Sequence, residues 1–183
     1  MNYHNILHDD MRNGEGLRIT LFVSGCEHHC LNCQNSQTWD CNGGINFDIA
    51  AKEEIFEKLN KDYIAGLTLS GGDPLHEKNL QDILYLCKEV REKFPDKTIW
   101  IYSGYTWDEI FKNTYNSKRL VQNLEERNEL YRQMIIAQCD VFVDGKYIEE
   151  LSDVNYHWAG SSNQKIIDVQ KSLEQNKVVL YCD

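Results

Sequence analysis

The chain of 183 residues lacks several features that mark particular classes of protein. No apolar run approaches the roughly 18 residues that a membrane-spanning helix needs, so the sequence predicts no contact with a membrane. The N-terminal residues MNYHNILHDD are polar and acidic and lack the basic and apolar segments of a signal peptide, which predicts a cytoplasmic protein. With only two prolines and no low-complexity tract, the chain shows no linker. We therefore expect one domain over residues 1–183.

Positive charge is also scarce. The 19 Lys and Arg residues face 29 Asp and Glu residues, which gives a net charge of −10. Binding to a phosphate backbone requires a basic face. Nucleic acid is therefore not expected as a partner.

Cysteine, in contrast, is plentiful, with seven residues in the chain. Three of them, Cys26, Cys30 and Cys33, follow the spacing C-x3-C-x2-C within the stretch SGCEHHCLNCQN. A disulfide framework is not expected in a cytoplasmic protein. Thiolate sulfur is a soft ligand that selects zinc or an iron–sulfur cluster over hard cations. The cysteine segment is thus the first candidate for a metal site.

The spacing alone leaves three kinds of metal site open. A structural zinc ion takes four protein ligands, and His28 or His29 could supply the fourth. A closed iron–sulfur cluster takes four cysteines, and Cys41 could be the last of these. The third possibility is a cluster in which one iron has no protein ligand, because a catalytic metal site keeps one position for substrate or cofactor.

Strands and helices alternate along the sequence, which predicts βαβ units and a largely parallel sheet of the α/β class. The expected strands cover residues 17–24, 66–70, 98–103, 141–144 and 178–182. The expected helices cover residues 49–60, 78–94 and 119–137, and the capping box TWDE (106–109) opens another.

Glycine-rich and polar segments follow the first four of these strands: GCEHHCLNC, GGDP, GY and DGK. In parallel sheets, ligands bind at the carboxyl ends of the strands, so these segments should form one shared site. Gly71 and Gly72 lack a Cβ, which would let the backbone approach a ligand closely. Pro74 disfavours helical geometry at Asp73 and keeps it in an extended loop.

The combination of C-x3-C-x2-C after one strand with Gly-Gly-Asp-Pro after the next resembles the radical S-adenosylmethionine (SAM) enzymes. The blocks TLFVSGCEHHCLNCQN, LSGGDPLH, VDGKY and WAGSSNQKIIDV resemble, more narrowly, the glycyl-radical activating enzymes of anaerobic ribonucleoside-triphosphate reductases. These blocks run from residue 20 to residue 169, so the resemblance covers most of the chain. The cysteine spacing is shared by the whole superfamily, whereas GSSNQ (160–164) is more specific to these activases.

This resemblance implies an incomplete parallel β/α barrel, which suits a chain shorter than the about 200 residues of a full barrel. It implies an oxidoreductase that cleaves SAM at a [4Fe–4S] cluster. The 5′-deoxyadenosyl radical so formed would take a hydrogen atom from a glycine of the large reductase subunit. That glycine lies on the partner, so no residue of this chain needs to be a nucleophile or a general base. An electron donor such as flavodoxin or ferredoxin and a homodimer are implied as further partners.

By the same resemblance, Cys26, Cys30 and Cys33 hold three irons of the cluster, and SAM occupies the fourth. The residues implied to surround SAM are Asn32, Cys33, Gln34, Gly71, Gly72, Asp73, Asp144 and Lys146, with Ser103 as a weaker candidate.

Two other functions remain as alternatives: a radical SAM enzyme acting on a small, purine-like molecule, and a zinc or iron–sulfur module without catalysis. Several further residues are predicted to have no role in the chemistry. Cys87 lies on the apolar stripe of its helix and should be buried, and His28 and His29 should only fill the cysteine loop.

Overall fold

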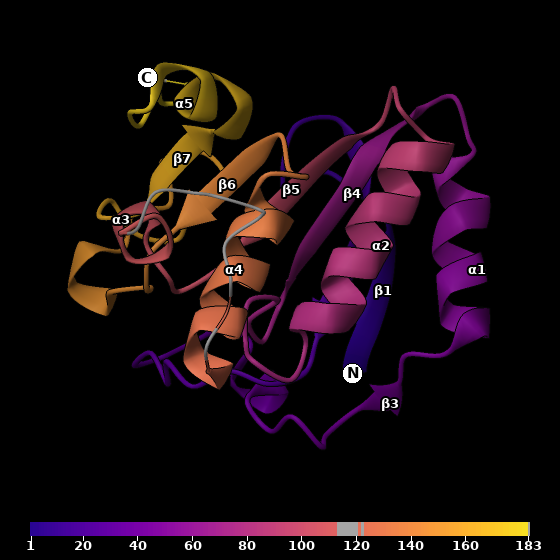
Figure 1. The fold of residues 1–183 in the computed structure, drawn as a ribbon, viewed down its shortest axis with the longest axis horizontal. Coiled ribbons are helices and arrows are strands. Elements are labelled where there is room, and N and C mark those ends of the chain that lie inside the picture. Colours follow the sequence, from indigo (N-terminus) through magenta and orange to yellow (C-terminus); the bar gives the residue numbers. More distant parts are fainter. Residues whose placement is uncertain (113–120, 122, 183) are drawn as a thin grey trace.

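The computed structural model describes residues 1–112, 121 and 123–182 (Figure 1). The strands are β1 (Asn2–Asp10), β2 (Leu17–Val23), β3 (Ile45–Asn46), β4 (Ile64–Gly71), β5 (Thr98–Tyr102), β6 (Val141–Asp144) and β7 (Lys165–Asp168). The helices are α1 (Ile49–Leu59), α2 (Leu80–Lys93), α3 (Trp107–Ile110), α4 (Leu124–Ile136) and α5 (Val169–Gln175), with short 3-10 turns η1 (Ser36–Thr38) and η2 (Glu149–Leu151).

The strands form one mixed sheet in the order β3-β1-β2-β4-β5-β6-β7. Strands β2, β4, β5 and β6 run parallel to one another and form its centre. Strands β1, β3 and β7 pair antiparallel at the two sides. The predicted α/β alternation and parallel centre are confirmed, and antiparallel strands extend the sheet on both sides.

Three sequence predictions differ from the structure. The N-terminal segment, for which no strand was predicted, forms β1 and pairs with β2. The strand predicted at 178–182 is wrong, because in this tail only Leu180 forms an isolated bridge, to Ile167. The helix predicted from residue 119 begins at Leu124 in α4, and residues 119, 120 and 122 lie outside the described part of the chain.

Helices α1, α2 and α4 lie on one face of the sheet (Figure 1). Alternate residues of β2 point to this face, where Ile19, Leu21 and Val23 are fully buried. The apolar stripe predicted for α2 meets them and continues the core. Its buried members are Leu80, Ile83, Leu84, Leu86, Cys87 and Val90.

The carboxyl ends of the parallel strands meet at one edge, as the topology predicts. The backbone N–H of Asp73, after β4, donates to the carbonyl oxygen of Gly25, after β2, at 2.7 Å. The N–H of Gly145, after β6, donates to the carbonyl oxygen of Tyr105, after β5, at 3.0 Å. These bonds link the loop after β2 with that after β4, and the loop after β5 with that after β6. The Asp73 side chain joins the two pairs, because it accepts from the Gly104 N–H.

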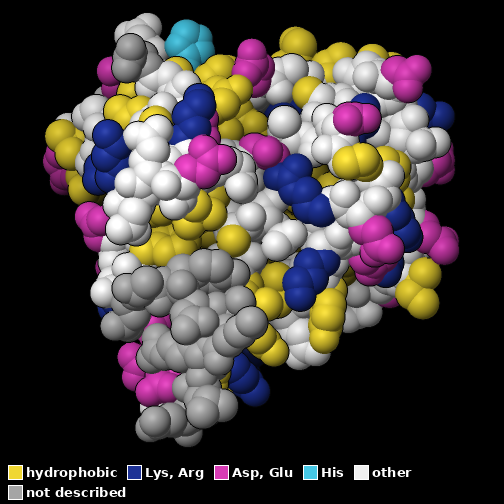
Figure 2. Space-filling view, turned by 45° about the horizontal axis from the view of Figure 1, so that its top comes forward, with side chains coloured by type: hydrophobic (Ala, Val, Ile, Leu, Met, Phe, Trp, Pro, Cys, Tyr) yellow, Lys and Arg dark blue, Asp and Glu magenta, His cyan; other side chains and the backbone are white. Residues whose placement is uncertain are grey.

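The surface carries charges of both signs. Figure 2 shows Lys and Arg side chains interspersed with Asp and Glu on the face in view, with apolar side chains between them. No helix in the described part of the chain is long and apolar enough to cross a membrane.

Candidate cluster and cofactor site

The cysteine loop, residues 24–33, leaves the end of β2 and is held at its base by backbone hydrogen bonds. Gly25 N–H donates to Thr38 O at 2.7 Å, and Cys26 N–H donates to Trp39 O at 3.1 Å. Near its end the loop turns, with Cys33 N–H donating to Cys30 O at 3.2 Å. The loop therefore has a fixed base and carries its three thiols on a short turn.

The three thiols of this loop are free and partly exposed. Burial raises the pKa of the Cys26 thiol to about 11. Burial also raises the pKa of Cys30, although the Tyr147 backbone N–H and the Lys146 ammonium group act in the opposite direction. The turn after β6 thus supplies a hydrogen-bond donor and a positive charge beside Cys30, and both favour a thiolate.

Gly71 and Gly72 hold the end of β4 against the cysteine loop. Gly71 has a φ of +105°, which favours glycine. A Cβ on Gly72 would lie 2.5 Å from the carbonyl oxygen of Gly25 and 2.9 Å from that of Thr38. Gly72 therefore packs closely on the base of the cysteine loop, whereas Gly71 packs on the backbone of Phe22 and Val23 at the end of β2.

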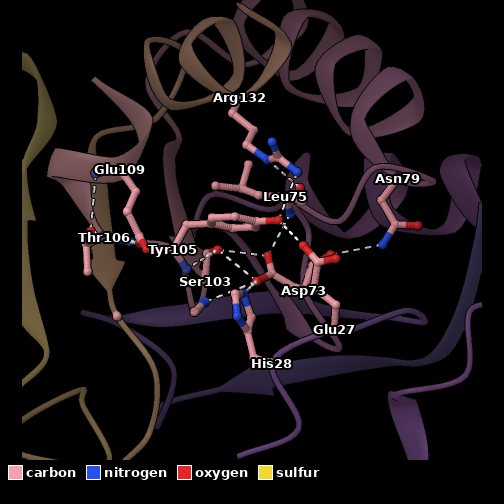
Figure 3. Close-up of polar contacts among 12 residues, drawn as sticks. Glu27, His28, Asp73, Leu75, Asn79, Ser103, Tyr105, Thr106, Glu109 and Arg132 are labelled. Atoms are coloured by element: carbon pink, nitrogen blue, oxygen red, sulfur yellow. Dashed lines mark hydrogen bonds and ion pairs between the residues drawn. The ribbon is translucent and has the colours of Figure 1, made fainter. Parts of the chain in front are cut away.

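The Asp73 carboxylate is the centre of a buried hydrogen-bond network (Figure 3). Ser103 Oγ donates to it at 2.8 and 2.9 Å, and Gly104 N–H donates at 3.1 Å. The N–H of Leu75 donates to Oδ1 at 2.8 Å. His28 Nε2 lies 2.7 Å from Oδ2. One carboxylate thus joins the cysteine loop, the end of β4 and the end of β5.

A second network lies beside the first (Figure 3), and its Tyr105–Glu27 bond is exposed. The Tyr105 hydroxyl donates to the Glu27 carboxylate and accepts from Arg132 Nη2 at 2.9 Å. Arg132 Nε also donates to Leu75 O at 3.0 Å, and its guanidinium group lies 4.3 Å from the centre of the Tyr105 ring. Burial raises the pKa of Tyr105 well above its usual value, so the phenol stays protonated. Helix α4 is thereby connected to the residue that follows Cys26.

The two predicted residues after β6 differ in their surroundings. Asp144 is buried, and its carboxylate accepts from the N–H groups of Trp107 at 2.9 Å and Lys165 at 3.0 Å. Burial raises the pKa of Asp144. Lys146 is exposed, and its carbonyl oxygen accepts from Asn163 Nδ2 at 2.9 Å. The Asp144 side chain therefore supports the turn, while the ammonium group of Lys146 is the accessible charge.

The structure brings most of the predicted residues to one place. The three cysteines, the Gly71–Asp73 segment and the Asp144–Lys146 turn surround the same edge of the sheet, and Asn32 and Gln34 lie exposed in the loop. Among residues 1–112, 121 and 123–182, no three His, Cys, Asp or Glu side chains converge on a position for a single metal ion.

Comparison with known proteins places the chain in a family. The family model described as a 4Fe-4S single cluster domain matches residues 12–167. An anaerobic ribonucleoside-triphosphate reductase-activating protein of Escherichia coli K12 is 40% identical over 168 residues, which cover 91% of this chain and 97% of the relative. The proteins of the same name from Haemophilus influenzae and from enterobacteria phage T4 are 39% and 37% identical, again over 91% of this chain and over 97% and 93% of their own lengths.

The chain belongs to the anaerobic ribonucleoside-triphosphate reductase-activating proteins. The donor set of the cysteine loop suits the iron–sulfur cluster of this family, because cysteine thiolates are the ligands that such clusters take. The loop carries three partly exposed free thiols, at Cys26, Cys30 and Cys33. Cys87 and Cys139 are fully buried in the core, as predicted for Cys87, and lie away from this loop's thiols.

Sequence reasoning missed two residues that hold the candidate site together. His28, expected only to fill the loop, is buried and paired with Asp73. Asn79, at the start of α2, donates from Nδ2 to Ser24 O at 2.8 Å and to Asp73 O at 3.0 Å. Neither residue contributes to the apolar periodicity of the sequence from which strands and helices are predicted. The only available hint was that His28 and Asp73 both follow strands that were predicted to end at the same edge.

Proposed function

We propose that this protein is a radical SAM enzyme that activates an anaerobic ribonucleoside-triphosphate reductase. When bound, the [4Fe–4S] cluster would supply one electron, received from an electron donor protein, for the cleavage of SAM to methionine and a 5′-deoxyadenosyl radical, which would take a hydrogen atom from a glycine of the large reductase subunit. The products are 5′-deoxyadenosine and a glycyl radical on the partner. The observation that carries the proposal is the three-cysteine loop in a chain 40% identical to an activating protein over 91% of its length.

The role of this chain is to hold and orient the two cofactors. Cys26, Cys30 and Cys33 would hold the cluster and leave its fourth iron for the amino and carboxylate groups of SAM. The fixed base of the loop supports this assignment, because the Gly25 and Cys26 N–H groups bond to Thr38 and Trp39. A thiol set with a rigid base keeps the open iron at a constant position relative to the sheet edge.

The proposed SAM site lies between the cysteine loop and the ends of β4 and β6. The Gly71–Asp73 segment lines the methionine end with its backbone, and Asn32 and Gln34 contact the adenosyl portion. Lys146 supplies a positive charge for the SAM carboxylate, which its exposure at the edge supports. Asp144 holds the beginning of the Lys146 turn through its bonds to Trp107 and Lys165.

The proposed architecture is a single radical SAM domain, residues 1–183, whose parallel strands form an incomplete barrel. The four parallel strands at the centre of the sheet support it. An incomplete barrel leaves an open side, through which a glycine loop of a partner protein can enter. The proposed partners are the large reductase subunit, a flavodoxin or ferredoxin as electron donor, and a second copy of this chain, all in the cytoplasm.

An anaerobic activation experiment tests the proposal. The purified protein is reconstituted with iron and sulfide, reduced, and mixed with SAM in the presence or absence of the large reductase subunit. Electron paramagnetic resonance (EPR) should show a carbon-centred radical only with the subunit, together with formation of 5′-deoxyadenosine. Deoxyadenosine formed in turnover of a purine-like small molecule, with no radical on the subunit, would favour the small-molecule enzyme instead. Bound zinc, or a cluster that does not respond to SAM, would overturn the proposal.

A further inference from the structure

His28 occupies a buried position in the middle of the cysteine loop, between Cys26 and Cys30. Its side chain is 7% exposed, and that of its partner Asp73 is 1% exposed. The distance from His28 Nε2 to Asp73 Oδ2 is 2.7 Å, a hydrogen bond to a carboxylate group. A loop residue with no structural role would instead turn its imidazole to solvent, as the exposure of the neighbouring His29 illustrates.

Asp73 is itself held rigidly. Its carboxylate accepts from Ser103 Oγ, from Gly104 N–H and from Leu75 N–H. Its own N–H donates to Gly25 O at 2.7 Å. The carboxylate is therefore fixed by groups from the ends of β4 and β5, and a side chain that bonds to it is fixed to the sheet edge.

The surroundings of the His28 ring fit an imidazole closely. A Cβ on Gly104 would lie 2.2 to 2.6 Å from three atoms of the ring, so the ring packs directly on the Gly104 backbone. The ring also meets Tyr105 edge-on, with centroids 4.8 Å apart. Steric fit and hydrogen bonding thus select the same position for His28 (Figure 3).

We propose that His28 and Asp73 form a loop anchor, in which His28 is a positioning residue that holds the Cys26–Cys30 arm of the cluster loop against the ends of β4 and β5. This inference rests on the proposed function, since it takes the three cysteines as cluster ligands. Because the Asp73 carboxylate is occupied by the hydrogen bonds of the anchor, we expect only the backbone of Asp73 to contact SAM. Partners that orient the ligands of a metal site from outside govern the site's affinity and electronic properties.

The first test replaces His28 in the reconstituted full chain. His28→Ala should keep the fold, by circular dichroism, but release iron to a chelator faster, because the loss of such an orienting partner typically lowers metal affinity about 10- to 100-fold. Its reduced cluster should also give an altered EPR line shape before SAM is added. His28→Gln should restore both properties in large part, because the glutamine amide nitrogen can reach the position of the imidazole Nε2 and donate to Asp73.

A matched control lies in the same loop. His29 is exposed and contacts the Trp39 ring, and its φ of +47° is one that asparagine tolerates. His29→Asn should therefore leave the rate of iron release and the EPR spectrum unchanged. If His28→Ala releases iron no faster than the parent protein and His29→Asn do, the anchor is overturned.

A second test reaches the anchor from the opposite side. Gly104→Ala adds a methyl group where the His28 ring lies, and φ at Gly104 is not in the left-handed region, so the backbone accepts alanine. This variant should expel the ring and reproduce the faster iron release of His28→Ala. The double variant should be no worse than His28→Ala alone, because the ring is already gone. Additive effects in the double variant would overturn the anchor, even if His28→Ala were itself poorly folded.

These measurements separate the anchor from the proposed function. Iron release and the EPR spectrum of the reduced cluster are recorded without SAM and without the reductase subunit. An unchanged His28→Ala protein that still generates the glycyl radical overturns the anchor and leaves the function standing. A parent protein that assembles no [4Fe–4S] cluster overturns both.

Discussion

The Gln164 side chain donates from Nε2 to the carbonyl oxygen of Gly145 at 2.8 Å. Its Oε1 accepts from the backbone N–H of Gly160 at 2.9 Å. Gln164 thus ties the segment before β7 to the turn after β6, and that turn places Lys146 and Tyr147 beside Cys30. The GSSNQ block, which carried the narrower resemblance to these activases, is therefore linked to the cysteine loop through the turn after β6.

Gln164→Ala should lower the free energy of unfolding by about 1–3 kcal/mol, because several backbone groups lose a hydrogen-bond partner. Gln164→Glu keeps the oxygen that accepts from Gly160 but cannot donate to Gly145, so it should lose only part of this stability. Urea unfolding followed by circular dichroism measures both. Gln81→Ala, on the exposed side of α2, is the control and should stay within about 0.5 kcal/mol. A Gln164→Ala protein as stable as this control would contradict the role of Gln164.

Gly72→Ala should lower both the melting temperature and the iron content of the reconstituted protein. The added Cβ would meet Gly25 O at 2.5 Å, so the base of the cysteine loop must move, at a cost of about 1–3 kcal/mol. Gly43→Ala is the matched control, because its nearest contact is Asp40 O at 3.2 Å. Equal losses of iron in the two variants would show that the contact of Gly72 with the loop base does not matter.

The sequence predicted the location of the site because that location follows from general rules. Apolar runs such as the one in β2 reveal strands, and parallel strands bring their carboxyl ends to one edge. The capping box at Thr106 and Glu109 was also visible, because its residue types occur at fixed spacing, and the structure confirms it. Local patterns and topology thus predicted which segments meet.

The contacts within the site could not be predicted in the same way. The pairing of His28 with Asp73 joins residues far apart in the sequence, and a single polar pair leaves no periodicity. Strand β1 was hidden because its polar residues alternate poorly and its register shifts between Tyr3 and Asn5 and between Leu7 and Asp10. The apolar tail at 178–182 was mistaken for a strand, although it contributes only one bridge to β7.

Protonation of Asp10 should lower the free energy of unfolding of the protein at acid pH. Its carboxylate is buried, but hydrogen bonds from Asn13, Thr20 and the Arg12 N–H outweigh the effect of burial and hold its pKa below its usual value. A lowered folded-state pKa contributes stability that is complete above the unfolded pKa of about 4 and is lost as pH falls through the folded pKa. The difference in unfolding free energy between the parent protein and Asp10→Asn should therefore shrink below about pH 4. A difference independent of pH from 7 to 3 would contradict this assignment.

Cys30→Ala should abolish assembly of the [4Fe–4S] cluster, because we propose Cys30 as one of its three protein ligands. Cys87→Ala should leave assembly intact, since Cys87 is fully buried in the core, and should cost only stability. Cys41→Ala tests whether a fourth thiol is needed. Cys41 lies beside Gly25 and is the candidate fourth ligand of a closed cluster. Iron and sulfide per chain, measured after anaerobic reconstitution, should fall for Cys30→Ala alone. Equal iron in Cys30→Ala and Cys87→Ala would contradict the ligand assignment, and a loss in Cys41→Ala would leave no iron free for SAM.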